Sequence, residues 1–241
     1  MRAEWAIEAV GLVKYYGTIL AISGVDLRVR LGEFLTIFGP NGAGKTTLIK
    51  ILATLLKPTA GKVRLNGREI TGDREALRRE IGFISHHTLL YGGLTAHENL
   101  KFYGKMYGVP NLKDRIEEVI KEVGLTERLH SQVRTLSRGM QQRLTLARAI
   151  LHDPSILLFD EPYTGLDPTA LRIFGELVGR LHDGSRAIIM TTHNISSGLE
   201  GCSRVAIQVG GKITFDKPRS VIDPATFEAV YFHHVQGGTP C

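Results

Sequence analysis

A glycine-rich loop directly after an apolar run constrains this chain most. The loop reads Gly39-Pro40-Asn41-Gly42-Ala43-Gly44-Lys45-Thr46-Thr47, and the run before it is Phe34-Leu35-Thr36-Ile37-Phe38. In the spacing G-x-x-x-x-G-K-T, glycines let backbone N–H groups close on a phosphate, lysine neutralises its charge and threonine meets Mg²⁺. A helix is predicted from about Lys45 to a stop at Pro58, with its positive end towards the phosphates. A simple turn between two elements is the alternative.

The rest of the chain alternates strand and helix patterns, which predicts an α/β fold. Residues 5–38 and 61–67 have strand patterns, and residues 86–152 have a helical pattern in which Gly124 ends one helix. The apolar runs 156–159 and 187–190 flank a further helical pattern, as in buried parallel strands joined by a crossover helix. Residues 204–215 predict a hairpin with a two-glycine turn. The last residues, 237–241, are expected to be loose.

Composition limits the class of protein. The chain has 241 residues, of which 43% are hydrophobic, so it can bury a full core. Its net charge of +6 comes from Lys and Arg scattered among acids, so no nucleic-acid partner is expected. The two cysteines, Cys202 and Cys241, have no metal-binding spacing. With neither an apolar span nor a signal-peptide core, the chain is expected to be soluble, and any membrane part to come from another polypeptide.

Two acids follow the apolar run 156–159. Asp160 and Glu161 would lie at the C-terminal end of a strand, where an α/β sheet opens its ligand crevice. Asp160 is suited to hold Mg²⁺ through water, together with Thr46 of the loop, and Glu161 is suited to polarise an attacking water. Taken alone, the pair would be interpreted as a surface turn. Beside a phosphate loop, it predicts phosphoryl-transfer chemistry.

These motifs, in their order and spacing, resemble the nucleotide-binding subunit of an ATP-binding cassette (ABC) transporter over nearly the whole chain. Leu136-Ser137-Arg138-Gly139-Met140 is similar to the family's signature segment, and Thr164-Gly165-Leu166-Asp167 is similar to its D-loop. His193 matches the switch histidine, and Tyr16 matches the aromatic residue that stacks on adenine. By itself, Tyr16 would be assigned to core packing, and His193 could equally be a structural histidine. Their positions relative to the other motifs support the functional interpretation.

The resemblance implies the fold and the assembly. The fold would be a P-loop NTPase of ABC ATPase type, with a mainly parallel core sheet, an N-terminal antiparallel β subdomain and an inserted helical subdomain. A single domain, 1–241, is expected, with the core and β subdomain in residues 1–85 and 153–241 and the helical subdomain in 86–152. Two ATPase subunits, as a homodimer or pseudo-dimer, would each bind ATP and Mg²⁺. Each ATP would lie between the loop residues 39–47 and adenine-stacking Tyr16 of one subunit and the signature residues 136–140 of the other.

The signature segment departs from the family pattern L-S-G-G-Q at Arg138 and Met140. Ser137 and Gly139 remain and can offer a hydroxyl and backbone N–H groups at the start of a helix. Arg138 either adds charge near phosphate or points to solvent.

His86 stands where most family members have a glutamine that touches Mg²⁺ and the attacking water. Imidazole is a poor ligand for Mg²⁺. We therefore expect His86 to act catalytically on the water or phosphate region, together with Glu161 and His193. Titration near the reference pKa of about 6.5 would make turnover pH-dependent. The alternatives are that His86 packs in a loop or that His87 takes its place.

Residues around this position suggest a subfamily. His86, residues 90–100 and residues 138–143 resemble most closely the haem-exporter ATPases linked to cytochrome c maturation. The apolar residues near 89–107 form either a groove for a helix of the membrane subunit or the core of the helical subdomain: Leu89, Leu90, Tyr91, Phe102, Tyr103 and Tyr107.

The leading function is an ATPase on the cytoplasmic face of the membrane that powers a separate permease, an exporter, with haem for cytochrome c maturation as its cargo. The alternative is ABC-2-type export of drugs, lipids or polysaccharides. More remote are a soluble ABC ATPase acting on DNA repair or ribosomes and a nucleotide switch without turnover.

Overall fold

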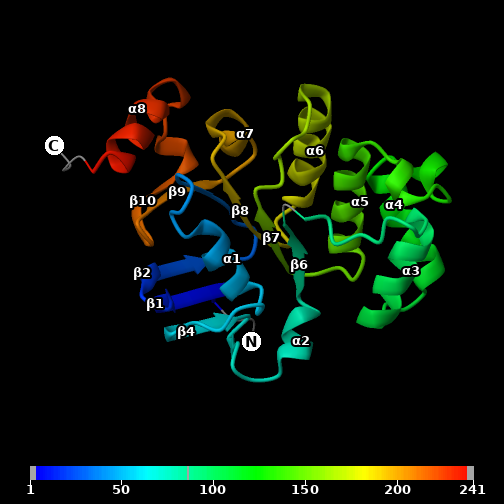
Figure 1. The fold of residues 1–241 in the computed structure, drawn as a ribbon, viewed down its shortest axis with the longest axis horizontal. Helices are drawn as coiled ribbons and strands as arrows, with labels where there is room; N and C mark the ends of the chain where they lie inside the picture. The colour runs from blue at the N-terminus through cyan, green and yellow to red at the C-terminus, as the bar shows by residue number, and fades with distance from the viewer. Residues whose placement is uncertain (1–3, 86, 238–241) are drawn as a thin grey trace.

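Two β-sheets and surrounding helices make up the fold in the computed structural model, which describes residues 4–85 and 87–237 (Figure 1). His86 and most of the predicted loose end, residues 238–241, lie outside the described residues. No helix in the described ranges is long and apolar enough to cross a membrane.

The larger sheet has six strands in the order β10-β9-β3-β8-β7-β6. Its strands from β9 to β6 run parallel, and β10 pairs antiparallel with β9. The central strands are almost entirely buried, which explains their continuous apolar runs. The strands are β3 (Phe34–Phe38), β6 (Ile81–Ile84), β7 (Ile156–Asp160), β8 (Ala187–Thr192), β9 (Arg204–Val209) and β10 (Lys212–Pro218).

The smaller sheet is antiparallel and has the order β2-β1-β4-β5. Together with the parallel sheet and its helices, it confirms the predicted fold class. The strands are β1 (Ile7–Tyr16), β2 (Ile19–Val29), β4 (Ala60–Leu65) and β5 (Arg68–Glu69).

The two faces of the parallel sheet bury different partners. Alternate residues such as Leu35 and Ile37 belong to a core shared with α1 (Lys45–Leu52) and the antiparallel sheet. Phe34 and Phe38 face a second core, which contains residues from most of the remaining helices. This alternation follows from the two-residue period of a strand.

Helix α1 is shorter than the sequence suggests. It ends at Leu52 rather than near Pro58, because Thr54 adopts a left-handed backbone with φ 61° and the chain turns back on the carbonyl of Lys50. Leu55, which lies within the range of the predicted helix, falls beyond its end and is exposed.

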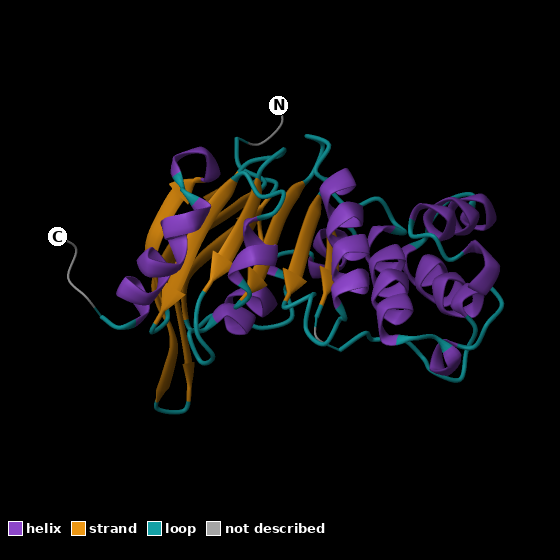
Figure 2. Ribbon diagram, turned by 90° about the horizontal axis from the view of Figure 1, so that it is seen from above, coloured by secondary structure: helices purple, strands orange, loops and turns teal. Residues whose placement is uncertain are grey.

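The chain between β6 and β7 contributes α3, α4 and α5, which gather at one end of the molecule (Figure 2). The division of the chain into a core and a helical subdomain at residues 86–152 stays a prediction. The remaining helices are α2 (Arg74–Arg78), α3 (Ala96–Tyr107), α4 (Leu112–Glu122), α5 (Arg138–Ile150), α6 (Pro168–Leu181), α7 (Ile195–Leu199) and α8 (Pro224–Val235).

Close packing of α5 on β6 makes a testable prediction about Gly82. A Cβ at this position would lie 2.4 Å from the carbonyl oxygen of Ala149 and 2.6 Å from Leu157. Gly82→Ala should therefore lower the free energy of unfolding by about 1–3 kcal/mol.

The matched control is Gly179→Ala, at an exposed position of α6 with nothing within 4 Å. It should raise the free energy of unfolding by about 0.5–1 kcal/mol. Urea denaturation of both variants measures the contrast, and equal stabilities would contradict this description of the packing.

Candidate active site

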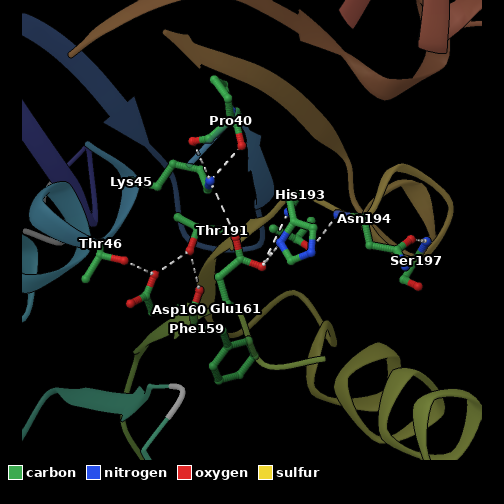
Figure 3. A network of polar contacts seen from close by, with 12 residues as sticks. Pro40, Lys45, Thr46, Phe159, Asp160, Glu161, Thr191, His193, Asn194 and Ser197 are labelled. Atoms are coloured by element: carbon green, nitrogen blue, oxygen red, sulfur yellow. Dashed lines mark hydrogen bonds and ion pairs between the residues drawn. The ribbon is translucent and has the colours of Figure 1, made fainter. Parts of the chain in front are cut away.

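The loop between β3 and α1 surrounds the side chain of Lys45. The Nζ atom of Lys45 donates hydrogen bonds to the carbonyls of Gly39 (2.6 Å) and Pro40 (3.2 Å), and the residue is only 6% exposed (Figure 3). A cavity of about 310 Å³ lies over the loop and is lined by Ala21, residues 40–47 and Glu161. Its size is at the low end for small-molecule pockets, about 300–1,000 Å³.

Strand β2 and the hairpin turn after β9 pack against this loop and fix its position. The backbone N–H of Gly211, in the hairpin turn between β9 and β10, donates to the carbonyl of Ala43 (3.0 Å). Gly44 precedes α1 with φ 98°, and a Cβ there would lie 2.3 Å from the carbonyl oxygen of Ala21 on β2. Only glycine fits this position, because both its backbone conformation and its surroundings exclude a side chain.

Asp160 joins the ends of the central strands. Its Oδ1 accepts hydrogen bonds from the hydroxyls of Thr46 (3.0 Å) and Thr191 (2.8 Å), and the residue is buried. Hydroxyl and carboxylate oxygens are the ligand type that Mg²⁺ prefers, so Thr46 and Asp160 fit the predicted metal role. The described ranges contain no group of three or more His, Cys, Asp or Glu placed to hold a metal. Phosphate and water oxygens would therefore complete such a site.

Glu161 has a left-handed backbone, with φ 51°, and its N–H donates to the carbonyl of Thr191 (3.0 Å). This conformation is uncommon for a residue other than glycine. One carboxylate oxygen lies 3.4 Å from Lys45 Nζ, and the other lies 2.8 Å from His193 Nδ1. The carboxylate is thus held at the edge of the cavity, between a lysine that can meet phosphate and a histidine.

His193 and Tyr16 are both accessible. The His193 side chain is 58% exposed, so it is not a buried structural histidine. Tyr16 is 46% exposed at the end of β1, where the hairpin leads into the β2 segment that contains the cavity-lining Ala21. Core packing, the alternative for Tyr16, is therefore wrong, because an exposed ring fills no core.

The signature segment does not meet the loop within one chain, since none of residues 136–140 is among the described residues that line the cavity. The Ser137 hydroxyl caps α5 by accepting from the N–H of Met140 (3.3 Å), and Leu136 is buried in the core. Asp167 similarly caps α6 by accepting from the N–H of Ala170 (2.9 Å).

Arg138 is exposed, and it also makes a contact that the sequence did not predict. Its guanidinium donates to the carbonyl of Thr164 (3.1 Å) and lies over Gly165. Neither alternative from the sequence included this contact, because the contact joins two segments that are far apart in the sequence.

His86 lies outside the described residues, so its catalytic role stays a prediction. The alternative His87 is at the surface, and its carbonyl accepts from the hydroxyl of Ser85 (2.8 Å). The apolar residues near 89–107 divide into two sets. Leu89, Tyr91 and Phe102 are exposed, whereas Leu90, Tyr103 and Tyr107 are partly buried.

Two residues with contacts at the site were given no role of their own from the sequence. Thr191 bonds Asp160, and the Gln142 amide donates to the carbonyl of Pro162 (2.8 Å). A polar residue at the C-terminal end of a predicted buried strand was the available signal for Thr191. For Gln142, the signal was a polar residue on the apolar face of a predicted helix, because it lies one turn before Leu146.

The comparisons with known proteins agree with this geometry. The family model described as ABC transporter matches residues 22–164, which include the loop, the signature segment and the Asp160-Glu161 pair. The chain belongs to the ABC transporter family. This membership confirms the expected class of enzyme, an ABC-type ATP hydrolase with an ATP-binding domain.

Two relatives and one solved structure show the extent of the similarity. The linearmycin resistance ATP-binding protein of Bacillus subtilis is 35% identical over 83% of this chain and 65% of its own length. Nod factor export ATP-binding protein I of Ralstonia nicotianae is 35% identical over 88% of this chain and 67% of its own length. The chain thus spans about two thirds of these relatives. A dimeric ATP-binding cassette structure, in a post-hydrolysis state bound to ADP and Pi, has 28% identity and a TM-score of 0.80 over 88% of this chain and 98% of that chain.

The loop glycines make a second testable prediction. Gly42 and Gly44 both have positive φ, but a Cβ at Gly42 would meet nothing within 4 Å, whereas one at Gly44 would clash with β2. Gly42→Ala should lower the free energy of unfolding by about 1–2 kcal/mol, and Gly44→Ala by about 1–3 kcal/mol more. Guanidinium denaturation compares the two variants. If Gly44→Ala were no less stable than Gly42→Ala, strand β2 would not confine the loop as described.

Proposed function

We propose that this chain is the ATP-hydrolysing subunit that powers a separate membrane exporter. The observation that carries the proposal is the position of the Glu161 carboxylate, which lines the phosphate-loop cavity and contacts both Lys45 and His193. A phosphate cradle, a neutralising cation and a positioned base are the parts that ATP hydrolysis requires.

In the proposed mechanism, ATP lies with its phosphates on residues 39–47 and its adenine against Tyr16. Backbone N–H groups of the loop and the Lys45 ammonium neutralise the phosphate oxygens. Mg²⁺, held by Thr46 and Asp160, would supply further neutralisation of the phosphate charge. Glu161 accepts a hydrogen bond from the attacking water and draws its proton as the water approaches the γ-phosphate. His193 fixes the orientation of the carboxylate through its Nδ1 contact.

The signature residues complete the site from a second subunit. Ser137 and Gly139 lie at the start of α5, a helix of 13 residues whose positive end suits the γ-phosphate of a partner's ATP. Their absence from the cavity of their own chain supports a head-to-tail dimer. The solved dimeric cassette with ADP and Pi offers a precedent of the same fold.

An exposed apolar cluster provides the surface for the membrane subunit. Leu89, Tyr91, Phe102 and Met106 are each about half exposed, and the rings of Tyr91 and Phe102 meet edge to face at 5.3 Å. Tyr91 is the largest of these and is 51% exposed. An apolar surface of this kind supports docking of a partner, which would place the chain on the cytoplasmic face of the membrane.

The relatives favour one class of cargo over another. Those reported above are, by name, a linearmycin resistance protein and a Nod factor export protein. They support the alternative from the sequence, ABC-2-type export of drugs, lipids or polysaccharides, better than haem export for cytochrome c maturation. We therefore propose export of a drug, lipid or polysaccharide.

Removing the loop lysine tests nucleotide binding. Lys45→Ala deletes a charge-assisted phosphate contact, so the Kd for ATP should rise about 10–100-fold. Isothermal titration with Mg-ATP measures this. Lys50→Ala, on the same helix but outside the cavity lining, is the matched control and should bind ATP as the wild type does. Equal affinities for the two variants would contradict the assignment of the loop.

Removing the base separates binding from hydrolysis. Glu161→Gln keeps the shape of the side chain but cannot draw a proton, so ATP turnover should fall at least about 100-fold while ATP binding persists. Size-exclusion chromatography with light scattering should show an ATP-dependent dimer. Glu176→Gln, at an exposed position of α6, should hydrolyse ATP normally. Normal hydrolysis by Glu161→Gln would show that another group is the base.

The same variant identifies the partner. Tagged Glu161→Gln protein, purified from its own membranes in mild detergent with ATP, should bring down an integral membrane exporter that mass spectrometry identifies. Haem-handling subunits would support the cytochrome-maturation reading, and only DNA-repair or ribosomal proteins would refute the transport function.

A further inference from the structure

Two side chains of α5 donate hydrogen bonds to the segment that follows Glu161. Arg138 and Gln142 are four residues apart, so they lie on one face of the helix. The Arg138 guanidinium donates to the carbonyl of Thr164 (3.1 Å), and the Gln142 amide donates to the carbonyl of Pro162 (2.8 Å). We call Arg138 and Gln142 the α5 clamp.

The segment that the clamp holds follows Glu161 directly in the chain and is also hydrogen-bonded to it. The N–H of Thr164 donates to the carbonyl of Glu161 (3.2 Å), which closes residues 161–164 into a turn. Glu161 itself has a left-handed backbone. A residue in such a conformation keeps it only when its surroundings fix the chain on both sides. On one side the fixing contact is the bond from the Glu161 N–H to Thr191, and on the other side it is the α5 clamp.

The clamp is closely fitted. Gln142 is only 8% exposed, so its amide and the Pro162 carbonyl pair away from solvent. A Cβ at Gly165 would lie 2.5 Å from the Arg138 guanidinium carbon, so the guanidinium lies directly against this glycine. A Cβ at Gly139 would lie 2.7 Å from that of Ala170, which brings the start of α5 against the start of α6.

We propose that Arg138 and Gln142 are positioning residues for the Glu161 carboxylate. They couple the N-terminus of α5, which is the part of the chain that meets a partner's ATP, to the base that acts on the chain's own ATP. A shift of α5 on dimer formation moves the 161–164 turn and thereby sets the carboxylate against the attacking water. This inference rests on the proposed function of Glu161 as the base. It goes further by assigning a role to two residues outside the phosphate cavity.

The test compares two neighbouring glutamines. Gln142→Met removes the bond to Pro162 at nearly constant volume. Gln141→Met removes amide bonds to the carbonyls of Val133 and Leu136, and neither of these bonds involves residues 161–164. The full chain of each variant is assayed for steady-state ATPase, for the Kd of Mg-ATP and for thermal unfolding.

For Gln142→Met we expect kcat to fall about 10–100-fold, because misplacing a catalytic group by about 1 Å has an effect of this size. The Kd for ATP should stay within about twofold, since the phosphate loop is intact. Gln141→Met should keep kcat within about twofold. The inference would be overturned if Gln142→Met had the wild-type kcat. It would also be overturned if the fall in kcat were matched by an equal loss of thermal stability or of affinity for ATP.

Arg138, the exposed residue of the clamp, provides a second test if Gln142→Met does not fold. Arg138→Gln should lower kcat, and Arg138→Lys should restore part of it by donating to the Thr164 carbonyl. Equal rates in all three proteins would refute the clamp. Failure of the proposed function gives a different result, in which the wild type hydrolyses ATP no faster than Glu161→Gln does.

Discussion

The hydrogen bonds that Asp160 accepts are the interaction on which the rest of the site depends. They join the end of β7 to Thr191 on β8 and to Thr46 at the start of α1. Strand order makes this possible, because β3, β8 and β7 are neighbours and their parallel directions bring their C-terminal ends to one edge. The phosphate-loop residue Thr46 and Asp160 therefore come from segments more than 100 residues apart and still meet within hydrogen-bond distance.

Charged and polar groups contact one another in a continuous row at the cavity. Lys45 lies between the loop carbonyls and Glu161, and Glu161 lies between Lys45 and His193. The Glu161 carboxylate also acts at longer range: burial raises the pKa of the Tyr231 hydroxyl, and the negative charge of Glu161 adds to this effect.

The sequence predicted what depends on local pattern. The loop follows from its spacing, the buried strands from their apolar runs, and the hairpin from its two glycines. Contacts between distant segments were not predictable in this way. The premature end of α1 depends on the backbone of Thr54, and the contact of Arg138 depends on where residues 164–165 pass. Periodicity likewise did not separate exposed Tyr91 and Phe102 from inward-facing Tyr103, because all three are aromatic and close in sequence.

Strand β3 has a consequence for how the protein is made. Its only partners in the described sheet are β8 and β9, which end at Thr192 and Val209. The hairpin turn that supports the phosphate loop follows β9. During synthesis, the loop leaves the ribosome long before any of these strands exists, so its apolar run must wait unpaired. The phosphate loop therefore gains the support of the hairpin turn only after Gly211 has been synthesised, and until β8 has been made the apolar run of β3 has no strand to pair with.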